Sequence, residues 1–116
     1  MKPEQKKTLE LFYTAATDHD ATTLRSLLTD TFTFKSPIGV FDNPDDYVAH
    51  CMGFNGSISD SRSIAEGNQV VHMSILHAKF PNGDAHIPLC DVFTFDGDRI
   101  TAQELFTDAS QFPQPE

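Results

Sequence analysis

This sequence of 116 residues has no tryptophan, only two cysteines and few basic residues, and each shortage excludes a class of protein. Cys51 and Cys90 lie far apart and form no CxxC pair, which favours two reduced thiols over a disulfide framework. Eight Lys and Arg against seventeen Asp and Glu give a formal net charge of -9, which repels nucleic-acid phosphates and anionic lipid. We therefore expect neither a nucleic-acid partner nor a membrane partner.

Long hydrophobic runs are also missing. No apolar stretch approaches the roughly 20 residues of a membrane-spanning helix, and no basic segment precedes an apolar run as in a signal peptide. We therefore expect a cytoplasmic protein. The chain does contain ten Phe and 39% apolar residues, enough for one core. We expect a single domain over residues 1–116, in which the polar tail at about 109–116 frays.

Hydrophobic spacing and capping residues predict three helices. The first is expected within residues 3–20, where apolar side chains recur at i, i+3, i+4 and i+7: Leu9, Phe12, Tyr13 and Ala16. Asp20 suits the N-cap of a short second helix over residues 21–28. Asn43 suits the N-cap of a third helix within residues 43–54.

Alternation and turn residues predict the strands. "TFTFKSP" alternates with Phe32, Phe34 and Ser36 on one side, which indicates a strand that Pro37 ends. A loop through Gly39 is expected next. Later turn signals, "GN", "NG" and "DG", separate four antiparallel strands at about residues 59–66, 69–80, 85–95 and 99–107. The pattern predicts an α+β fold with two helices, a strand, a third helix and a four-stranded antiparallel meander.

One carboxylate interrupts an otherwise apolar strand, "IPLCDVFTF". Burying the ionised carboxylate of Asp91 there costs free energy unless the group is paired, hydrogen-bonded or neutralised by a shifted pKa. With a two-residue loop at Asn82 and Gly83, Asp91 lies opposite Ser74 and His72 lies opposite Phe93 on one shared face.

The last hairpin leaves two registers open. A two-residue loop at Asp96 and Gly97 would set Ala102 beside Asp91. A three-residue loop through Asp98 would set Gln103 there, and this is the register that we prefer.

The opposite face of these strands is too apolar for free exposure to water. No sequence remains for another layer, so we expect a homodimer through this outer face, centred on Val71, Met73, Ile75 and Val92. His77 and His86 fall on the same face, and His50 falls on the solvent side of the third helix. No two histidines form a convincing pair of ligands in this register, so we expect no metal.

Two segments resemble a known family. "YTAATDHDATTLRSLLTDTFTFKSPIG" is similar to the two helices and first strand of SnoaL-like members of the nuclear transport factor 2-like superfamily, and "DVFTFDGDRI" is similar to their closing hairpin. The resemblance covers nearly the whole chain. It implies a cone-shaped barrel in which a curved sheet wraps the helices around one apolar cavity, usually in a dimer. Members include ketosteroid isomerases, polyketide cyclases, limonene epoxide hydrolases, scytalone dehydratases and proteins that only bind or assemble.

The resemblance can be followed residue by residue. Asp91 occupies the place of the isomerases' oxyanion-stabilising aspartate, whereas Ser36 replaces their general-base aspartate. Phe12 occupies the place of their oxyanion-hole tyrosine, with Tyr13 one position off that face. Leu89 stands where the epoxide hydrolases have an arginine. The resemblance therefore implies neither ordinary ketosteroid isomerisation nor epoxide hydrolysis.

Two functions stay open. The first is a cofactor-independent isomerase, cyclase or dehydratase acting on an apolar carbonyl-bearing ligand, with Asp91 as the acid and His72 as the candidate base. Ser36, Ser74 and Gln103 would orient the ligand, and the cavity would be walled by Phe12, Phe34, Leu76, Leu89 and Phe93. The second is a non-catalytic dimeric ligand-binding or assembly module that uses the same cavity. For Asp91 itself, the alternative to a pocket acid is a structural carboxylate that Ser74, Gln103 or a water satisfies.

Overall fold

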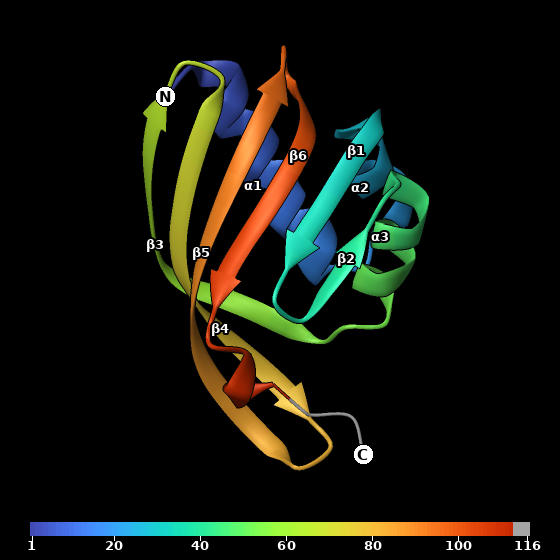
Figure 1. The fold of residues 1–116 in the computed structure, drawn as a ribbon, viewed down its shortest axis with the longest axis vertical. Helices are drawn as coiled ribbons and strands as arrows, with labels where there is room; N and C mark the ends of the chain where they lie inside the picture. The colour runs from blue at the N-terminus through green and yellow to red at the C-terminus, as the bar shows by residue number, and fades with distance from the viewer. Residues whose placement is uncertain (113–116) are drawn as a thin grey trace.

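The computed structural model describes residues 1–112 and confirms the α+β fold. Three helices accompany a six-stranded mixed sheet of order β2-β1-β6-β5-β4-β3, in which β1 runs parallel to β6 (Figure 1). The elements in chain order are α1 (Pro3–Thr17), α2 (Ala21–Ser26), β1 (Leu28–Ser36), β2 (Gly39–Phe41), α3 (Pro44–Met52), β3 (Gly56–Glu66), β4 (Gln69–Phe80), β5 (Gly83–Asp96), β6 (Arg99–Thr107) and the 3-10 helix η1 (Ala109–Gln111).

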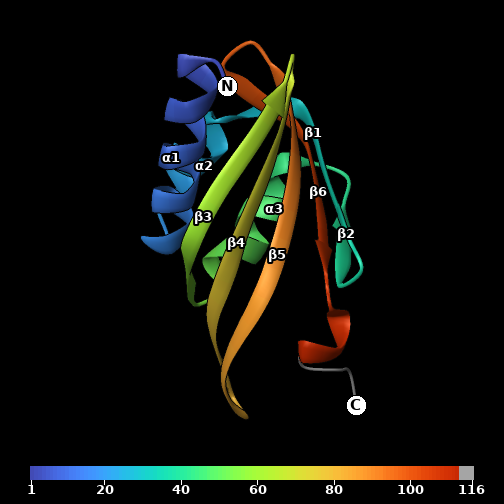
Figure 2. The ribbon, with the colours of Figure 1, turned by 90° about the vertical axis from the view of Figure 1, so that its left-hand side faces the viewer.

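The sheet is curved and encloses the helices from one side. α1 runs along the sheet, and α3 lies between β3 and the β1–β2 edge (Figure 2). The far ends of β4 and β5 extend beyond the helices as a long hairpin (Figure 1). This arrangement is the cone that the family resemblance implies. Within residues 1–112, no helix combines the length and apolar character needed to cross a bilayer.

Side-chain caps start the second and third helices as predicted. The Asp20 carboxylate accepts a hydrogen bond from the Thr23 amide at 3.1 Å, and Asn43 Oδ1 accepts one from the Asp46 amide at 2.9 Å. α2 ends at Ser26, two residues before its predicted end, because Leu28 already begins β1. The segment predicted as a loop through Gly39 instead forms the short strand β2, which pairs antiparallel with β1.

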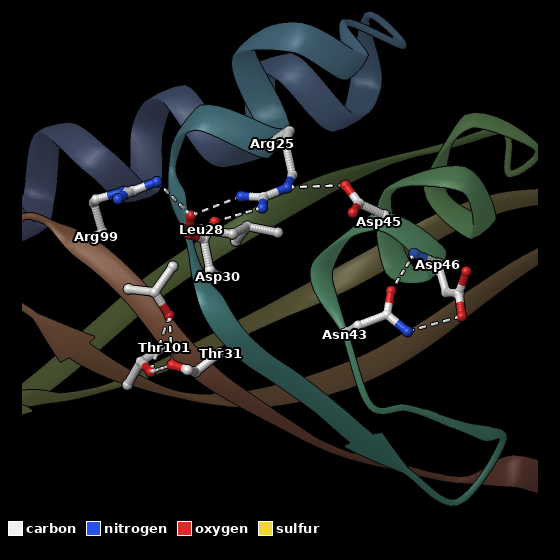
Figure 3. Close-up of polar contacts among 10 residues, drawn as sticks. Arg25, Leu28, Asp30, Thr31, Asn43, Asp45, Asp46, Arg99 and Thr101 are labelled. Carbon is white, nitrogen blue, oxygen red and sulfur yellow. Dashed lines mark hydrogen bonds and ion pairs between the residues drawn. The ribbon is translucent and has the colours of Figure 1, made fainter.

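A polar cluster joins the helices to the first strand (Figure 3). Arg25 contacts Asp30 of β1 at 2.7 Å and Asp45 of α3 at 3.0 Å. Arg25 and Arg99 both donate hydrogen bonds to the Leu28 carbonyl, at 3.1 and 2.8 Å. These contacts hold α2, α3 and β6 against the start of β1.

The apolar side chains form two clusters. The larger lies between the helices and the sheet and includes the fully buried Leu24, Leu28 and Phe32. The smaller lies under the long hairpin and consists of Leu76, Ala78, Ile87 and Phe112. Phe112 is only 8% exposed. The prediction of a frayed tail from residue 109 is therefore wrong for residues 109–112, since η1 returns Phe112 to the core; residues 113–116 lie outside the described residues.

The predicted β4–β5 register is wrong by two residues. Phe80 pairs with Gly83, so the loop consists of Pro81 and Asn82, and Gly83 takes a φ of +128°. Proline is favoured early in a tight turn, which places the loop one residue earlier than the "NG" signal alone suggests. Asp91 consequently lies opposite His72 rather than Ser74. A shift of two residues preserves the alternation of side chains, so the predicted faces stand.

Neither predicted register of the last hairpin is correct. Asp96 pairs with Arg99, and the register then shifts between Thr94 and Phe95. Leu105 lies opposite Asp91, and Gln103 lies opposite Phe93. The two-residue turn is Gly97 and Asp98, which neither prediction used, and the bulge then adds one unpaired residue that loop arithmetic does not anticipate. Gln103 nevertheless stays on the same face as Asp91 and is 6% exposed.

Candidate functional site

A cavity of about 160 Å³ lies where the two apolar clusters meet. Its wall combines residues of both clusters with the ends of α1, α3 and η1. Aromatic and aliphatic side chains dominate the wall, and Asp91 is its only carboxylate among the described residues. The lining residues that matter below are Phe12, Tyr13, Phe34, Ile38, Tyr47, His50, Cys51, Leu76, Leu89, Asp91, Gln103 and Phe112.

Asp91 is 2% exposed and has two neutral hydrogen-bond donors. The Tyr13 hydroxyl donates to Oδ2 at 3.0 Å, and Gln103 Nε2 donates to Oδ1 at 2.9 Å. The ion pairs found within residues 1–112 all involve Arg25, so none compensates the Asp91 charge. Burial raises the pKa of Asp91 to about 6, although the hydrogen bonds from Gln103 and Tyr13 act in the opposite direction. The carboxyl group can therefore gain and lose a proton close to neutral pH.

Tyr13 supplies the hydroxyl that the sequence comparison did not place. The sequence resemblance placed Phe12 at the position of the family's tyrosine and Tyr13 off the helix face that lines the cavity. This prediction is wrong, because it is the Tyr13 hydroxyl that contacts Asp91. Both side chains line the cavity, and their rings meet edge to face with centroids 5.1 Å apart. The long phenol of Tyr13 reaches Asp91 from the flank of the helix. Burial, followed by the nearby Asp91 charge, raises the pKa of Tyr13 well above its usual value, so its hydroxyl stays a donor.

His72 lies behind Tyr13 and is not part of the cavity wall. Its ring stacks on the Tyr13 ring with centroids 4.5 Å apart, and its Cα faces that of Asp91 across β4 and β5. Burial lowers the pKa of His72, which keeps the ring neutral. Its Nδ1 is buried without a hydrogen-bond partner among the described residues. This placement suits support of Tyr13 better than contact with a ligand.

The other predicted pocket residues divide into two groups. Phe12, Phe34, Leu76, Leu89 and Gln103 line the cavity, whereas Ser36, Ser74 and Phe93 do not. Ser36 Oγ donates to the Gly39 carbonyl at 2.9 Å and accepts from the Ile38 amide at 3.2 Å, so it closes the β1–β2 turn. Ser74 is 6% exposed and faces Leu89, while Phe93 is fully buried against Phe12.

Three lining residues come from α3, which the sequence analysis had not placed at the site: Tyr47, His50 and Cys51. His50 is exposed, as expected, but it also lies on the cavity wall, and burial of part of its ring lowers its pKa. Burial raises the pKa of the Cys51 thiol to about 11, so this thiol is a poor nucleophile. The helical spacing of Tyr47 and Cys51 indicated an inward face but not that a cavity lies there.

A curved sheet that wraps three helices around a cavity is the cone fold that the resemblance implied. The family model of the SnoaL-like domain matches residues 9–103, and the chain belongs to this family. No curated protein matches the sequence.

Solved structures with the same fold have distant sequences. An NTF2-like protein of unknown function from Cytophaga hutchinsonii superposes with a TM-score of 0.82 at 17% identity, over 95% of each chain. An LEH-like epoxide hydrolase from M. tuberculosis gives a TM-score of 0.82 at 18% identity, over 93% of this chain and 85% of the other. A provisionally named SnoaL-like polyketide cyclase from Shewanella denitrificans gives a TM-score of 0.82 at 18% identity, over 95% of this chain and 94% of the other. At such identities the likeness shows the fold alone.

Proposed function

We propose that the chain is a cofactor-independent enzyme that moves a proton on a small apolar carbonyl compound, in a reaction of the isomerase, cyclase or lyase type. The observation that supports this most is Asp91, a carboxylate that is 2% exposed and whose hydrogen bonds within residues 1–112 come from the neutral donors Tyr13 and Gln103. A purely structural carboxylate in a core is usually paired with a cation. The same fold in a provisionally named polyketide cyclase agrees with small-molecule chemistry.

The proposed step is a proton transfer that Asp91 begins in its ionised form. Asp91 takes a proton from the carbon beside the carbonyl, the C–H bond breaks, and its electron pair forms an enolate. Protonated Asp91 then donates a hydrogen bond to the Tyr13 oxygen. The Tyr13 hydroxyl keeps its proton and donates its own hydrogen bond to the enolate oxygen, which stabilises the enolate. Return of the proton to another carbon gives an isomer, and nothing is consumed.

His72 has no proton-transfer role in this proposal. A general base must lie within hydrogen-bond reach of the proton that it takes, and His72 stands behind Tyr13. We assign it a positioning role through its stack on the Tyr13 ring. His50, on the wall and exposed, is placed to exchange protons with solvent.

The cavity limits the size of the ligand. A cavity of about 150 Å³ lined by apolar side chains holds one benzene ring, and this one measures about 160 Å³. We therefore propose a ligand of which about one ring is enclosed by this wall. Gln103 Oε1 is buried without a hydrogen-bond partner among residues 1–112, so a hydroxyl on the ligand would satisfy it.

A single-ring probe tests the proposal. Cyclohex-3-enone would lose a proton next to its carbonyl and become the conjugated cyclohex-2-enone, which is followed by ultraviolet absorbance and by deuterium uptake in the NMR spectrum. Asp91→Asn should slow the reaction about 100-fold or more, because general acid–base catalysis contributes at least that much. Asp42→Asn, at an exposed site, should leave the rate unchanged. Equal rates for the native protein and Asp91→Asn would contradict the proposal.

The non-catalytic binding module is the second candidate, and one observation favours it. Ser36 stands where the isomerases have their general base, and its hydroxyl is engaged in the β1–β2 turn. Among the described residues, Asp91 is the single carboxylate on the cavity wall, so no second carboxylate there can act as a base. Saturable binding of the probe without any proton exchange would favour this candidate over the enzyme.

A further inference from the structure

His77 and His86 face each other on the sheet surface turned away from the helices. They form a register pair between β4 and β5, and their Nδ1 atoms lie 2.6 Å apart. Their rings are 4.7 Å apart between centroids, with planes at 74°. The two-residue correction of the register brings these histidines together, and the predicted register had concealed the pair. His77 is partly exposed and His86 is exposed, so an ion can approach from solvent.

A second element orients this pair. Ser59 Oγ lies 2.6 Å from His77 Nε2 and donates to Asp60 Oδ2 at 3.2 Å. Asp60 has a φ of +56°, at the point where the β3–β4 register shifts between Ser59 and Arg62. A left-handed backbone is unfavourable for a residue with a side chain, and bulges re-aim the side chains beside them. The result is a continuous chain of contacts from Asp60 through Ser59 and His77 to His86.

We propose that His77 and His86 bind one divalent transition-metal ion through their two Nδ1 atoms. Neutral imidazole is a preferred ligand of Zn²⁺, Cu²⁺ and Ni²⁺. The ion replaces the hydrogen that the two Nδ1 atoms share, and each ring then holds its hydrogen on Nε2. Metal–nitrogen bonds of about 2.0–2.1 Å at a tetrahedral ion place two nitrogens about 3.3 Å apart, so the two rings must turn and separate by about 0.7 Å from their contact at 2.6 Å. Water completes the coordination.

The neighbours of the pair fit this assignment. With a metal on Nδ1, His77 Nε2–H donates to Ser59 Oγ, which donates to the Asp60 carboxylate. Histidine ligands generally donate their other ring hydrogen to such an acceptor, which fixes the tautomer and the ring orientation. Ser59 and Asp60 are therefore positioning residues. The next register pair, Lys79 and Asp84, has opposite charges and adds no net repulsion, and the overall charge of -9 favours cations.

The site is separate from the cavity. His77 and His86 point away from the sheet face that holds Asp91, since side chains alternate along each strand. They share the outer face with the expected dimer contact, and Ile75 lies two residues along β4 from His77, about 7 Å at the usual rise. The metal site thus does not depend on the proposed reaction.

Zinc titration of the full chain by calorimetry tests the site. We expect one ion per chain, and a loss of affinity of about tenfold or more in His77→Ala and in His86→Ala. Ser59→Ala should weaken binding by about tenfold, because partners of a metal ligand typically contribute that much. His50→Ala removes an exposed histidine on α3, outside the pair, and should leave the zinc affinity unchanged.

NMR of the native protein provides a readout that does not depend on the variants folding. The ¹⁵N signals of Nδ1 in both His77 and His86 should shift on addition of Zn²⁺, and those of His50 should not. Unmoved Nδ1 signals, or equal zinc affinity in the native protein and both pair variants, would overturn the proposal. Binding at the thiols of Cys51 or Cys90 would give that result.

Discussion

At the scale of single residues, Asp91 makes the fold less stable than it could be. The pKa of about 6 in the folded protein, against an ordinary value of 3.8, means that burial opposes ionisation. The corresponding cost is absent below about pH 4, grows as pH rises through the window to about 6, and is complete above it. At 1.36 kcal/mol per pKa unit the cost is about 3 kcal/mol as an upper limit.

Asp91→Asn should therefore stabilise the protein near neutral pH. The amide has no charge to desolvate, and its oxygen can still accept from Tyr13. We expect the free energy of unfolding to rise by about 1 to 3 kcal/mol at about pH 8, with the gain shrinking toward pH 4, as measured by urea denaturation. Asp42→Asn is the exposed control and should change stability by less than about 0.5 kcal/mol. A gain that does not depend on pH would contradict this explanation.

Tyr13→Phe should raise the pKa of Asp91. The Tyr13 hydroxyl donates to the ionised carboxylate at 3.0 Å, so its removal disfavours the charged form. The pKa is measured from the ¹³C shift of the carboxyl carbon as pH is varied. Tyr47→Phe is the matched control, since Tyr47 lines the same cavity without a hydrogen bond to Asp91, and it should shift the pKa less. A larger shift in the control would show that the Tyr13 contact is not the cause.

At the scale of the elements, α3 builds one wall of the cavity and its start depends on Asn43. The side chain accepts from the Asp46 amide at 2.9 Å and donates to the Asp46 carboxylate at 2.9 Å. Asn43→Ala should lower the free energy of unfolding by about 1 kcal/mol, as measured by urea denaturation. Asp42→Ala, one residue earlier and outside the helix, is the control. Equal losses in both variants would mean that the cap does not stabilise α3.

Sequence patterns predicted the elements well because those signals are local. Caps at Asp20 and Asn43 and the alternation in β4 depend on neighbours a few residues away, and both caps are confirmed. Pairing across hairpins is less local. One misplaced turn at Pro81 moved every β4–β5 pair. The last turn consists of Gly97 and Asp98, which moved all β5–β6 pairs, and the bulge beyond Phe95 moved the later ones by one residue more.

The candidate site was partly predictable for the same reason. Asp91 was identified because an acid among apolar residues is visible in the sequence itself. The contact of Tyr13 with Asp91 was missed because helical spacing tells which way the Tyr13 side chain points, but not which residue its hydroxyl contacts. The contact joins residues 78 positions apart. The facing pair of His77 and His86 required the true register.

At the scale of the whole molecule, the outer sheet face is the surface where we expect a second copy to bind. Val71, Met73, Ile75 and Val92 are each only partly buried in the single chain. Sedimentation should give about twice the chain mass of 12.9 kDa, and Val71→Lys should give the single-chain mass. Leu11→Lys, on α1 and 40% exposed, should leave the dimer intact. A native protein that sediments as a single chain would contradict the expectation.

The central claim is that Asp91 is a proton-transfer group held by neutral donors inside a cavity. The most direct test is the ¹³C titration of the Asp91 carboxyl carbon in the native protein. The structure predicts an apparent pKa of about 6. A pKa near 4, the ordinary value of an aspartate in water, would show that the carboxylate is not desolvated and would contradict the account.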